Sequence, residues 1–337
     1  MQSIPKTGSS ETIRKTTFNF SRYKQDLVSH KKHGKIDPRF LEWFVGFSEA
    51  DLSFICSKTR LFFVISQKEE KILHRIRTEL GFGKVSTYKD HSRFIVADRN
   101  NIRRLIHLFN GNLVSQNTNI RFGLWLQSWN LWCRSTQEKK YLVEKLPDTD
   151  ISTTEIQRYQ KIQSHAKQSF VEREEYITPL ARNQLDSFDT NAWLSGFTDA
   201  YGSFNAVQTK DSTTNRSAKT SLHGLGLRFI LDQKSEKDVL EKVRTFFESG
   251  VVYQRKKEDD MWRFTCTSLS SHRLVLSYFN RYPLRTFKKV SFLRFSSLFR
   301  SITKRSVLSW QGTQSKALRR VYRRVESLIK KSSRKVD

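Results

Sequence analysis

The sequence predicts an α+β fold built from two pseudo-symmetric repeats, each ordered helix, strand, strand, helix, strand, strand, helix. Three observations predict this fold. A short motif occurs twice, as FVGFSEADL at residues 44–52 and as LSGFTDAYG at residues 194–202. Small residues recur four apart in each copy, which places them on one face of a helix. The segments that follow the two copies also match, which indicates an internal repeat.

The two motif segments are expected to form a pair of closely packed helices. Gly46 and Ala50 in the first copy, and Gly196 and Ala200 in the second, leave a face without bulky side chains. Two helix backbones can approach closely along such a face. The alternative is two ordinary amphipathic core helices. The match between the segments downstream of the motifs argues against that alternative.

The remaining elements of the first half follow from periodicity and from turn residues. A basic arm is expected first, at residues 1–36, with eight Lys or Arg against two acids. The expected elements after it are a helix at 37–51, two strands within 53–67, a helix at 68–80, strands at 84–88 and 93–97, and helices at 100–109 and 119–133.

The second half is expected to repeat this order after a linker at residues 134–186, which is long enough to hold helices of its own. The second repeat spans residues 187–302. Residues 303–337 carry eleven Lys or Arg against two acids around a helical apolar stripe, and they are expected to form a basic C-terminal helix or tail.

Matching stretches of the two halves recur in the same order. They pair 65–68 with 231–234, 83–85 with 250–252, 93–94 with 263–264 and 108–110 with 278–280. With these stretches and the paired motifs, the chain resembles the LAGLIDADG homing endonuclease and intron maturase family in its two-repeat, single-chain form. The resemblance covers roughly residues 37–133 and 187–302. It implies a saddle of two antiparallel sheets in a monomer with internal pseudo-twofold symmetry.

The net positive charge of the chain indicates a polyanionic partner. The 337 residues include 61 Lys and Arg against 33 Asp and Glu, a net charge of +28. Nucleic acid is the expected partner for such a chain, and an anionic membrane surface is the alternative. No run of 18 apolar residues is present, so no membrane span is predicted. The three cysteines lack metal-ligand or disulfide spacing, which fits a reducing compartment.

The hairpin after each motif differs in length. Residues 53–67 hold the first hairpin in 15 residues, whereas residues 203–233 hold the second in 31. The second hairpin can therefore reach about twice as far, at about 3.3 Å per residue. The family resemblance implies that long hairpins lie in the DNA major groove. The short first hairpin suits an extended duplex target poorly.

An aromatic stripe lies on the last expected helix of the first half. Phe122, Trp125, Trp129 and Trp132 recur at helical spacing. Such a stripe could stack on bases, but packing into the core is the favoured interpretation.

The resemblance also implies where strand cleavage would take place. Each motif helix of a cutting enzyme ends in a carboxylate at the eighth motif position, and the two carboxylates hold divalent metal ions such as Mg²⁺. Here that position is Asp51 in the first copy and Tyr201 in the second. A phenol with a pKa near about 10 is neutral at pH 7 and a poor Mg²⁺ ligand. Asp199 lies two residues earlier, about 200° around the helix, and should point away.

Other expected active-site positions are incomplete in the same way. The ninth motif position is Gly202 in the second copy but Leu52 in the first. The basic residue expected near each centre is Lys288 in the second half, but Asn117 takes its place in the first. Gln67 and Gln233 match the family's water-positioning residues.

The sequence therefore predicts that strand cleavage has been lost. On this interpretation Asp51, Gln67, Gln233 and Lys288 are vestigial catalytic positions. No cofactor is required, and no metal ligand is predicted unless it is Asp51. Mg²⁺ matters only if nuclease activity remains.

Basic clusters supply the predicted nucleic-acid contacts. They lie in the N-terminal arm, around the tips of the second-half hairpins, and in the C-terminal segment. The residues are Lys31, Lys32, Lys35, Lys210, Arg216, Lys219, Arg255, Lys256, Lys257, Arg319, Arg320, Arg323, Arg324, Lys330 and Lys331.

The sequence favours a nuclease scaffold that no longer cuts and that binds structured RNA. An organellar ribosome component, with rRNA and ribosomal proteins as partners, is the leading form. A group I intron maturase is close behind, and sequence alone does not separate them. The alternative of a different class is an active, Mg²⁺-dependent, site-specific DNA endonuclease. A DNA-binding regulator without cleavage is a third hypothesis. A mitochondrial location is implied by the resemblance and not by a targeting signal.

Overall fold

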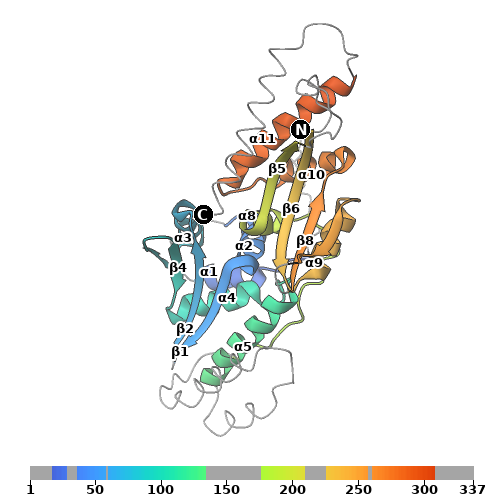
Figure 1. Cartoon of the computed structure of the whole chain (residues 1–337). Helices are drawn as coiled ribbons and strands as arrows, with labels where there is room; N and C mark the ends of the chain where they lie inside the picture. The colour runs from blue at the N-terminus through green and yellow to red at the C-terminus, as the bar shows by residue number, and fades with distance from the viewer. Residues whose placement is uncertain are drawn as a thin grey trace, which may run out of the picture.

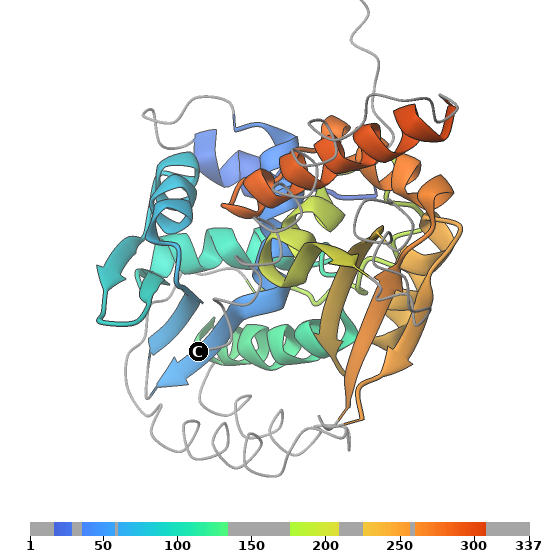
Figure 2. The same ribbon diagram turned by 45° about the horizontal axis from the view of Figure 1, so that its top comes forward.

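A computed structural model describes residues 17–28, 36–57, 60–133, 176–208, 225–256 and 260–307. It confirms the α+β fold and the two pseudo-symmetric repeats (Figure 1). The two halves place their sheets on either side of the paired motif helices (Figure 2).

The elements of the first half follow the expected order, with boundaries that move by up to three residues. They are α2 (Pro38–Asp51), β1 (Leu52–Ser57), β2 (Arg60–Gln67), α3 (Glu70–Leu80), β3 (Lys84–Thr87), β4 (Ser92–Val96), α4 (Arg99–Phe109) and α5 (Gln116–Cys133).

The second half repeats that order. Its elements are α8 (Trp193–Tyr201), β5 (Gly202–Gln208), β6 (Leu225–Lys234), α9 (Lys237–Phe246), β7 (Val251–Gln254), β8 (Met261–Cys266), α10 (Leu269–Arg281) and α11 (Lys288–Val307).

Each half contains a four-stranded antiparallel sheet with the same topology. The strand orders are β1-β2-β4-β3 and β5-β6-β8-β7. Leu52 pairs with Ile65 in the first sheet, and Gly202 pairs with Leu231 in the second. This register makes Gln67 and Gln233 equivalent positions, since each lies two residues beyond its paired residue.

Alternating side chains divide each sheet into a buried and an outward face. The inward face of the first sheet carries Phe54, Phe63 and Phe94, which are buried. The ring of Trp125 from α5 lies 4.8 Å from that of Phe54. Phe122, Trp125 and Trp129 are all buried, so the aromatic stripe packs into the core. The side chain of Trp132 lies outside the described part.

The motif helices α2 and α8 touch along their glycine faces. A Cβ atom built on Gly46 would lie 2.1 Å from the carbonyl oxygen of Trp193, and one on Gly196 would lie 1.9 Å from that of Trp43. The backbones are therefore too close for any side chain at these positions. Helix α2 begins at Pro38 behind Asp37, whose side chain accepts a hydrogen bond from Arg39 N.

Part of the predicted N-terminal arm belongs to the fold. Helix α1 (Ser21–Val28) packs on α4, and Phe18, Phe20 and Tyr23 are buried. The Asp26 carboxylate lies 3.5 Å from Arg103 Nε. The arm prediction for residues 1–36 is wrong for this stretch, because its aromatic residues cover an apolar surface of the first half.

The described end of the predicted linker, residues 176–192, runs as irregular chain. Asn130 holds it through a pair of hydrogen bonds with the Ile177 backbone, at 2.8 and 2.9 Å. Asn110 binds the Thr178 carbonyl and the Leu180 amide in the same way. No helix forms within 176–186, whereas residues 134–175, where linker helices were also expected, lie outside the described part.

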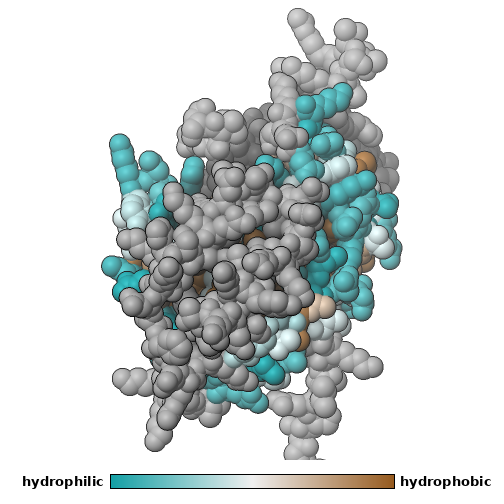
Figure 3. Space-filling view, turned by 90° about the horizontal axis from the view of Figure 1, so that it is seen from below, coloured by the Kyte–Doolittle hydropathy of each residue, from teal (hydrophilic) through white to brown (hydrophobic). Residues whose placement is uncertain are grey.

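Seen from below, the described surface is mainly hydrophilic, with small hydrophobic patches (Figure 3). Among the described helices, none is long and apolar enough to span a membrane.

Candidate functional site

The ends of the two motif helices meet at the centre of the molecule, and their eighth-position side chains interact differently. Asp51 ends α2, and its Oδ2 accepts a hydrogen bond from Gln67 Nε2. Tyr201 ends α8, and its hydroxyl donates to the carbonyl oxygen of Ala50 on the opposite helix. The phenol therefore binds the backbone beside Asp51, where a matching carboxylate would complete a metal site.

Burial and neighbours set the ionisation of this pair. Burial raises the pKa of Asp51, while the hydrogen bond from Gln67, the nearby Tyr201 hydroxyl and the charge of Lys288 lower it. Burial and then the negative charge of Asp51 raise the pKa of Tyr201 further above its ordinary value. Tyr201 is therefore a neutral donor at neutral pH.

Lys288 begins α11 and reaches the end of α8. Its Nζ donates to the carbonyl oxygens of Ala200 at 2.7 Å and Thr198 at 3.2 Å. A cation near a helix C-terminus is stabilised by the negative end of the dipole. Its charge also reaches Asp51 of the other half.

The sixth-position carboxylates show which positions of the two halves correspond. Glu49 accepts hydrogen bonds from Val114 N at 2.6 Å and Ser115 N at 2.9 Å. Asp199 accepts hydrogen bonds from the amides of residues 285 and 286, at 2.6 and 3.2 Å. Two residues beyond the second of these amides comes Asn117 in the first half and Lys288 in the second. Asn117 therefore occupies the position that corresponds to Lys288.

Asp199 faces away from the helix ends, as expected. It is 3% exposed and also accepts hydrogen bonds from Trp43 Nε1 and Thr286 Oγ1. Asn117 uses its Nδ2 to bind the Ser235 carbonyl at 3.1 Å. Neither side chain supplies the missing carboxylate or cation.

Gln233 is buried, and within the described part of the chain its Oε1 has no hydrogen-bond partner. Its equivalent, Gln67, is bound to Asp51. The second half has no eighth-position carboxylate to which a glutamine amide could donate, because Tyr201 takes that position and its hydroxyl binds the Ala50 carbonyl.

The donor set does not fit a pair of Mg²⁺ ions. Paired metals need several anionic oxygen ligands. Asp51 is the one eighth-position carboxylate, and the Ala50 and Ala200 carbonyls already accept from a hydroxyl and an ammonium group. In the described ranges, no three His, Cys, Asp or Glu side chains form a cluster that could hold a metal.

Two glutamates join the halves reciprocally beside this centre. Glu236 precedes α9 and accepts from Asn117 N at 2.8 Å and Ser115 Oγ at 2.5 Å. Glu69 precedes α3 and accepts from Phe287 N at 2.9 Å. Each acid thus binds the start of the other half's last helix. No local pattern in the sequence encodes this role of the two glutamates.

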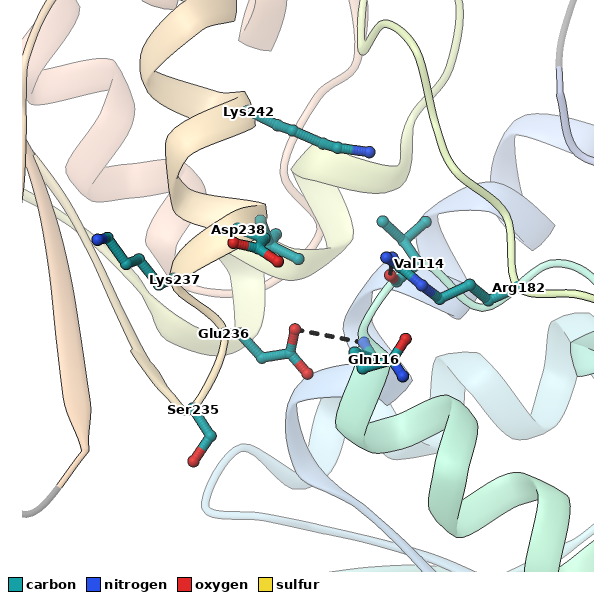
Figure 4. Close-up of a pocket in the computed structure, with 9 residues that line it drawn as sticks. Val114, Gln116, Arg182, Ser235, Glu236, Lys237, Asp238 and Lys242 are labelled. Carbon is teal, nitrogen blue, oxygen red and sulfur yellow. Dashed lines mark hydrogen bonds between the residues drawn. The ribbon is translucent and has the colours of Figure 1, made fainter. Parts of the chain in front are cut away.

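A pocket of about 160 Å³ lies beside Glu236, between the starts of α5 and α9 (Figure 4). Arg182 Nη1 donates to the Val114 carbonyl at 2.8 Å, and Lys242 Nζ donates to that of Gln184. Glu236 also accepts from Gln116 N at 3.3 Å. These groups tie residues 176–192 to both halves.

Two of the predicted nucleic-acid-binding residues can be placed. Arg255 Nη1 lies 4.0 Å from Asp232 Oδ2, and Lys256 is exposed just beyond β7. The others lie outside the described residues: Lys31, Lys32, Lys35, Lys210, Arg216, Lys219, Lys257, Arg319, Arg320, Arg323, Arg324, Lys330 and Lys331.

Comparison with known proteins decides the family. The sequence profile described as LAGLIDADG endonuclease matches residues 44–129 and 194–299, more than half of the chain. The chain belongs to the LAGLIDADG endonuclease family. The fold and the paired motifs predicted from the sequence are those of this family.

Relatives of this LAGLIDADG chain include intron-encoded proteins. "Probable intron-encoded endonuclease 4" of Neurospora crassa is 31% identical over 270 residues, which cover 78% of this chain and 40% of that protein. The chain therefore spans less than half the length of that relative. The "Uncharacterized cox1 intron-2 37.2 kDa protein" of Schizosaccharomyces pombe is 25% identical over 309 residues, covering 90% of this chain and 78% of that protein.

Solved LAGLIDADG structures share the fold. The homing endonuclease I-GzeII in complex with its DNA target has a TM-score of 0.59 and 19% identity, covering 85% of this chain and 96% of that chain. I-AabMI bound to uncleaved DNA has a TM-score of 0.60 and 19% identity, covering 86% of this chain and 98% of that chain. At such identities the likeness shows the fold alone.

Replacement of Glu49 by glutamine should change how stability depends on pH. Burial raises the pKa of Glu49 to about 8, opposed by the hydrogen bonds from Val114 and Ser115. The folded state therefore holds a proton that the unfolded chain releases near pH 4.5, so stability falls as pH rises from about 4.5 to about 8. Glu49→Gln should be less stable at pH 5 but should lose less stability between pH 5 and 8.

Urea unfolding at pH 5, 6, 7 and 8 measures this slope, and the exposed Glu248→Gln provides a control. An unchanged slope in Glu49→Gln would show that Glu49 stays ionised in the folded protein.

Proposed function

We propose that this LAGLIDADG protein binds structured RNA on a nuclease scaffold and does not make double-strand breaks in DNA. The observation that carries the proposal is the contact of Tyr201 with the Ala50 carbonyl. A neutral phenol stands here in the position of a metal-binding carboxylate, and its hydroxyl is already hydrogen-bonded to the opposite helix. A second metal ion would lack its anionic ligand.

The neighbouring residues support the same conclusion. Asn117 stands where the other half has Lys288, and its side chain binds the Ser235 carbonyl. The second half has no eighth-position carboxylate to which the amide of Gln233 could donate. A net charge of +28 nevertheless fits a polyanionic ligand. Binding of nucleic acid is therefore retained in this proposal while paired-metal cleavage is lost.

The intron origin of the relatives is the reason to propose intron RNA as the ligand. Their names describe an intron-encoded endonuclease and a cox1 intron protein. We propose a group I intron maturase role in mitochondria, the compartment implied by a cox1 intron. A ribosome component bound to rRNA is the other form of the same proposal, with ribosomal proteins as its partners.

Sedimentation of the native protein tests the proposal. An organelle lysate is centrifuged through a sucrose gradient at moderate salt, and the nucleic acid bound to the protein is sequenced. Light fractions that carry intron-containing transcripts are expected. Co-sedimentation with a ribosomal subunit and its rRNA would favour the ribosomal form. Recovery of duplex DNA without RNA would contradict RNA binding.

A second candidate is a Mg²⁺-dependent DNA endonuclease. The structure favours it at one point: Asp51 at the end of α2 accepts a hydrogen bond from Gln67, and the charge of Lys288 at the end of α8 reaches this carboxylate. The names of the relatives and the DNA-bound solved structures agree with it. Such an enzyme would combine Asp51 and Gln67 of the first half with Lys288 of the second and would nick one strand.

Any DNA locus recovered with the protein can separate these candidates. The locus is placed in a supercoiled plasmid and incubated with the protein and Mg²⁺. Intact supercoiled plasmid is expected under the main proposal. Nicked circles that vanish in Asp51→Asn would support the endonuclease, and linear plasmid would overturn the loss of double-strand cleavage.

A further inference from the structure

The outward face of the first sheet is apolar at its centre and basic at its edges. Its central side chains are directly paired across strands: Ile55 with Phe62, and Val64 with Ile95. All four are partly exposed. The basic residues around them are Arg60 on β2, Lys84 on β3 and Arg93 on β4. No Asp or Glu lies among the outward strand residues of this sheet.

The equivalent arginines of the two sheets have different neighbours. Arg93 pairs across strands with Ser66, whereas Arg263 pairs with Asp232. Arg263 donates two hydrogen bonds to the Asp232 carboxylate, at 2.6 and 2.7 Å, and this contact raises the pKa of the guanidinium. The charge of Arg263 is neutralised in place. Within the described ranges, no carboxylate contacts Arg93.

Arg93 instead belongs to an exposed aromatic cluster at the turn between β3 and β4. Its guanidinium lies 5.1 Å from the centre of the Tyr88 ring. The Tyr88 and His91 rings are stacked with centroids 5.1 Å apart and planes 14° from parallel. Tyr88 is 47% exposed. An exposed ring fixed in this way resembles the aromatic platforms on which proteins stack bases.

We propose that the outward face of the first sheet binds an unpaired RNA segment, with bases stacked on Tyr88 and Phe62 and phosphates held by Arg60, Lys84 and Arg93. The inference rests on the proposed function and names the part of the RNA that this sheet binds. Aromatic residues on an antiparallel sheet stack unpaired bases, while arginines and lysines bind the phosphates between them.

The shape of the sheet favours an unpaired strand over a duplex. Strand β1 has 6 residues and β2 has 8, with only residues 58 and 59 between them, so this hairpin can reach about half as far as the second one. The apolar centre offers flat contact surface but few hydrogen-bond donors for base edges. Base edges in a duplex are read mainly through hydrogen bonds, whereas stacking needs bases that are already exposed.

Binding of the full-length chain to an RNA of about 12 nucleotides tests the proposal. This length lies within the range of known single-strand binding sites. A fluorescein-labelled degenerate RNA is titrated at matched salt against single-stranded DNA and duplex DNA of the same length. Tyr88→Ala should weaken RNA binding about tenfold, and Tyr88→Trp should retain it. Arg93→Gln should weaken binding and lower the slope of log affinity against log salt by about one.

The matched control is Tyr253→Ala on the second sheet. Tyr253 lies on β7 and is 43% exposed. Its replacement by alanine should change RNA affinity by less than about twofold. Melting temperature verifies that each variant is folded. RNA carrying 4-thiouridine should also photo-crosslink to the peptide that contains Tyr88. A merely structural role of Tyr88 would not produce this crosslink.

Equal RNA affinity of Tyr88→Ala and Tyr253→Ala would overturn the inference, as would duplex DNA that competes as well as RNA. These results would leave the proposed function intact if the native protein still recovers intron transcripts. Failure to recover any RNA from the lysate would instead remove the proposed function and the inference together.

Discussion

Replacement of Gly196 by alanine is expected to abolish cooperative folding of the chain. The added Cβ would lie 1.9 Å from the Trp43 carbonyl oxygen and 2.7 Å from the Phe47 amide nitrogen. Both are backbone atoms of α2, so no side-chain rotation relieves the overlap. The helices would have to separate, which would open the core around Trp43 and Trp193, both of which are fully buried.

Urea unfolding and size-exclusion chromatography measure this effect. Gly123 provides a matched control, because it also lies within a helix but no atom beyond its chain neighbours and its own helix backbone would come within 4 Å of its added Cβ. Gly123→Ala should be neutral or more stable by about 0.5–1 kcal/mol. A Gly196→Ala protein with the wild-type unfolding midpoint would mean that the two helices are not held this closely.

Replacement of Tyr201 by aspartate is expected to make the stability of the protein depend on Mg²⁺. The variant would place two carboxylates at neighbouring helix C-termini, where each is disfavoured by the other and by the helix dipoles. It should therefore be less stable than wild type in EDTA. Added Mg²⁺ would bind between the two acids and stabilise the fold by about 1.4 kcal/mol at tenfold excess over its Kd.

Thermal melts with EDTA and with Mg²⁺ reveal the effect without knowledge of any target sequence. Tyr201→Phe is the matched control, since it removes the bond to the Ala50 carbonyl but adds no charge. It should lose about 1 kcal/mol and remain insensitive to Mg²⁺. A wild-type protein stabilised by Mg²⁺ as strongly as Tyr201→Asp would refute the loss of the paired-metal site.

Local sequence signals were sufficient for the repeat, the order of elements and the packing of the motif helices. The small residues at positions 46 and 196 and the alternation along the strands express short-range geometry that a sequence displays directly. The match of Asn117 with Lys288 was also readable, because turn and helix follow at the same spacing in both halves.

Contacts between distant residues were not readable. The Tyr201 hydroxyl binds a carbonyl 151 residues away in the chain, and Glu236 binds an amide 119 residues away. Neither contact produces a periodic pattern in the sequence. The packing of α1 was missed because its aromatic residues occur in a short, mostly polar stretch. The contrast between Ser66 and Asp232, however, could have been found by aligning the two repeats strand by strand.

The sixth-position carboxylates affect how such a protein can change over generations. Glu49 and Asp199 each hold the turn before a terminal helix through backbone hydrogen bonds, and neither is one of the eighth-position groups. Selection for a folded protein alone would then maintain an acid inside both motifs, together with the glycine face. A chain that no longer cuts would keep most of its family signature, so the presence of the motif reports folding constraints and not catalysis.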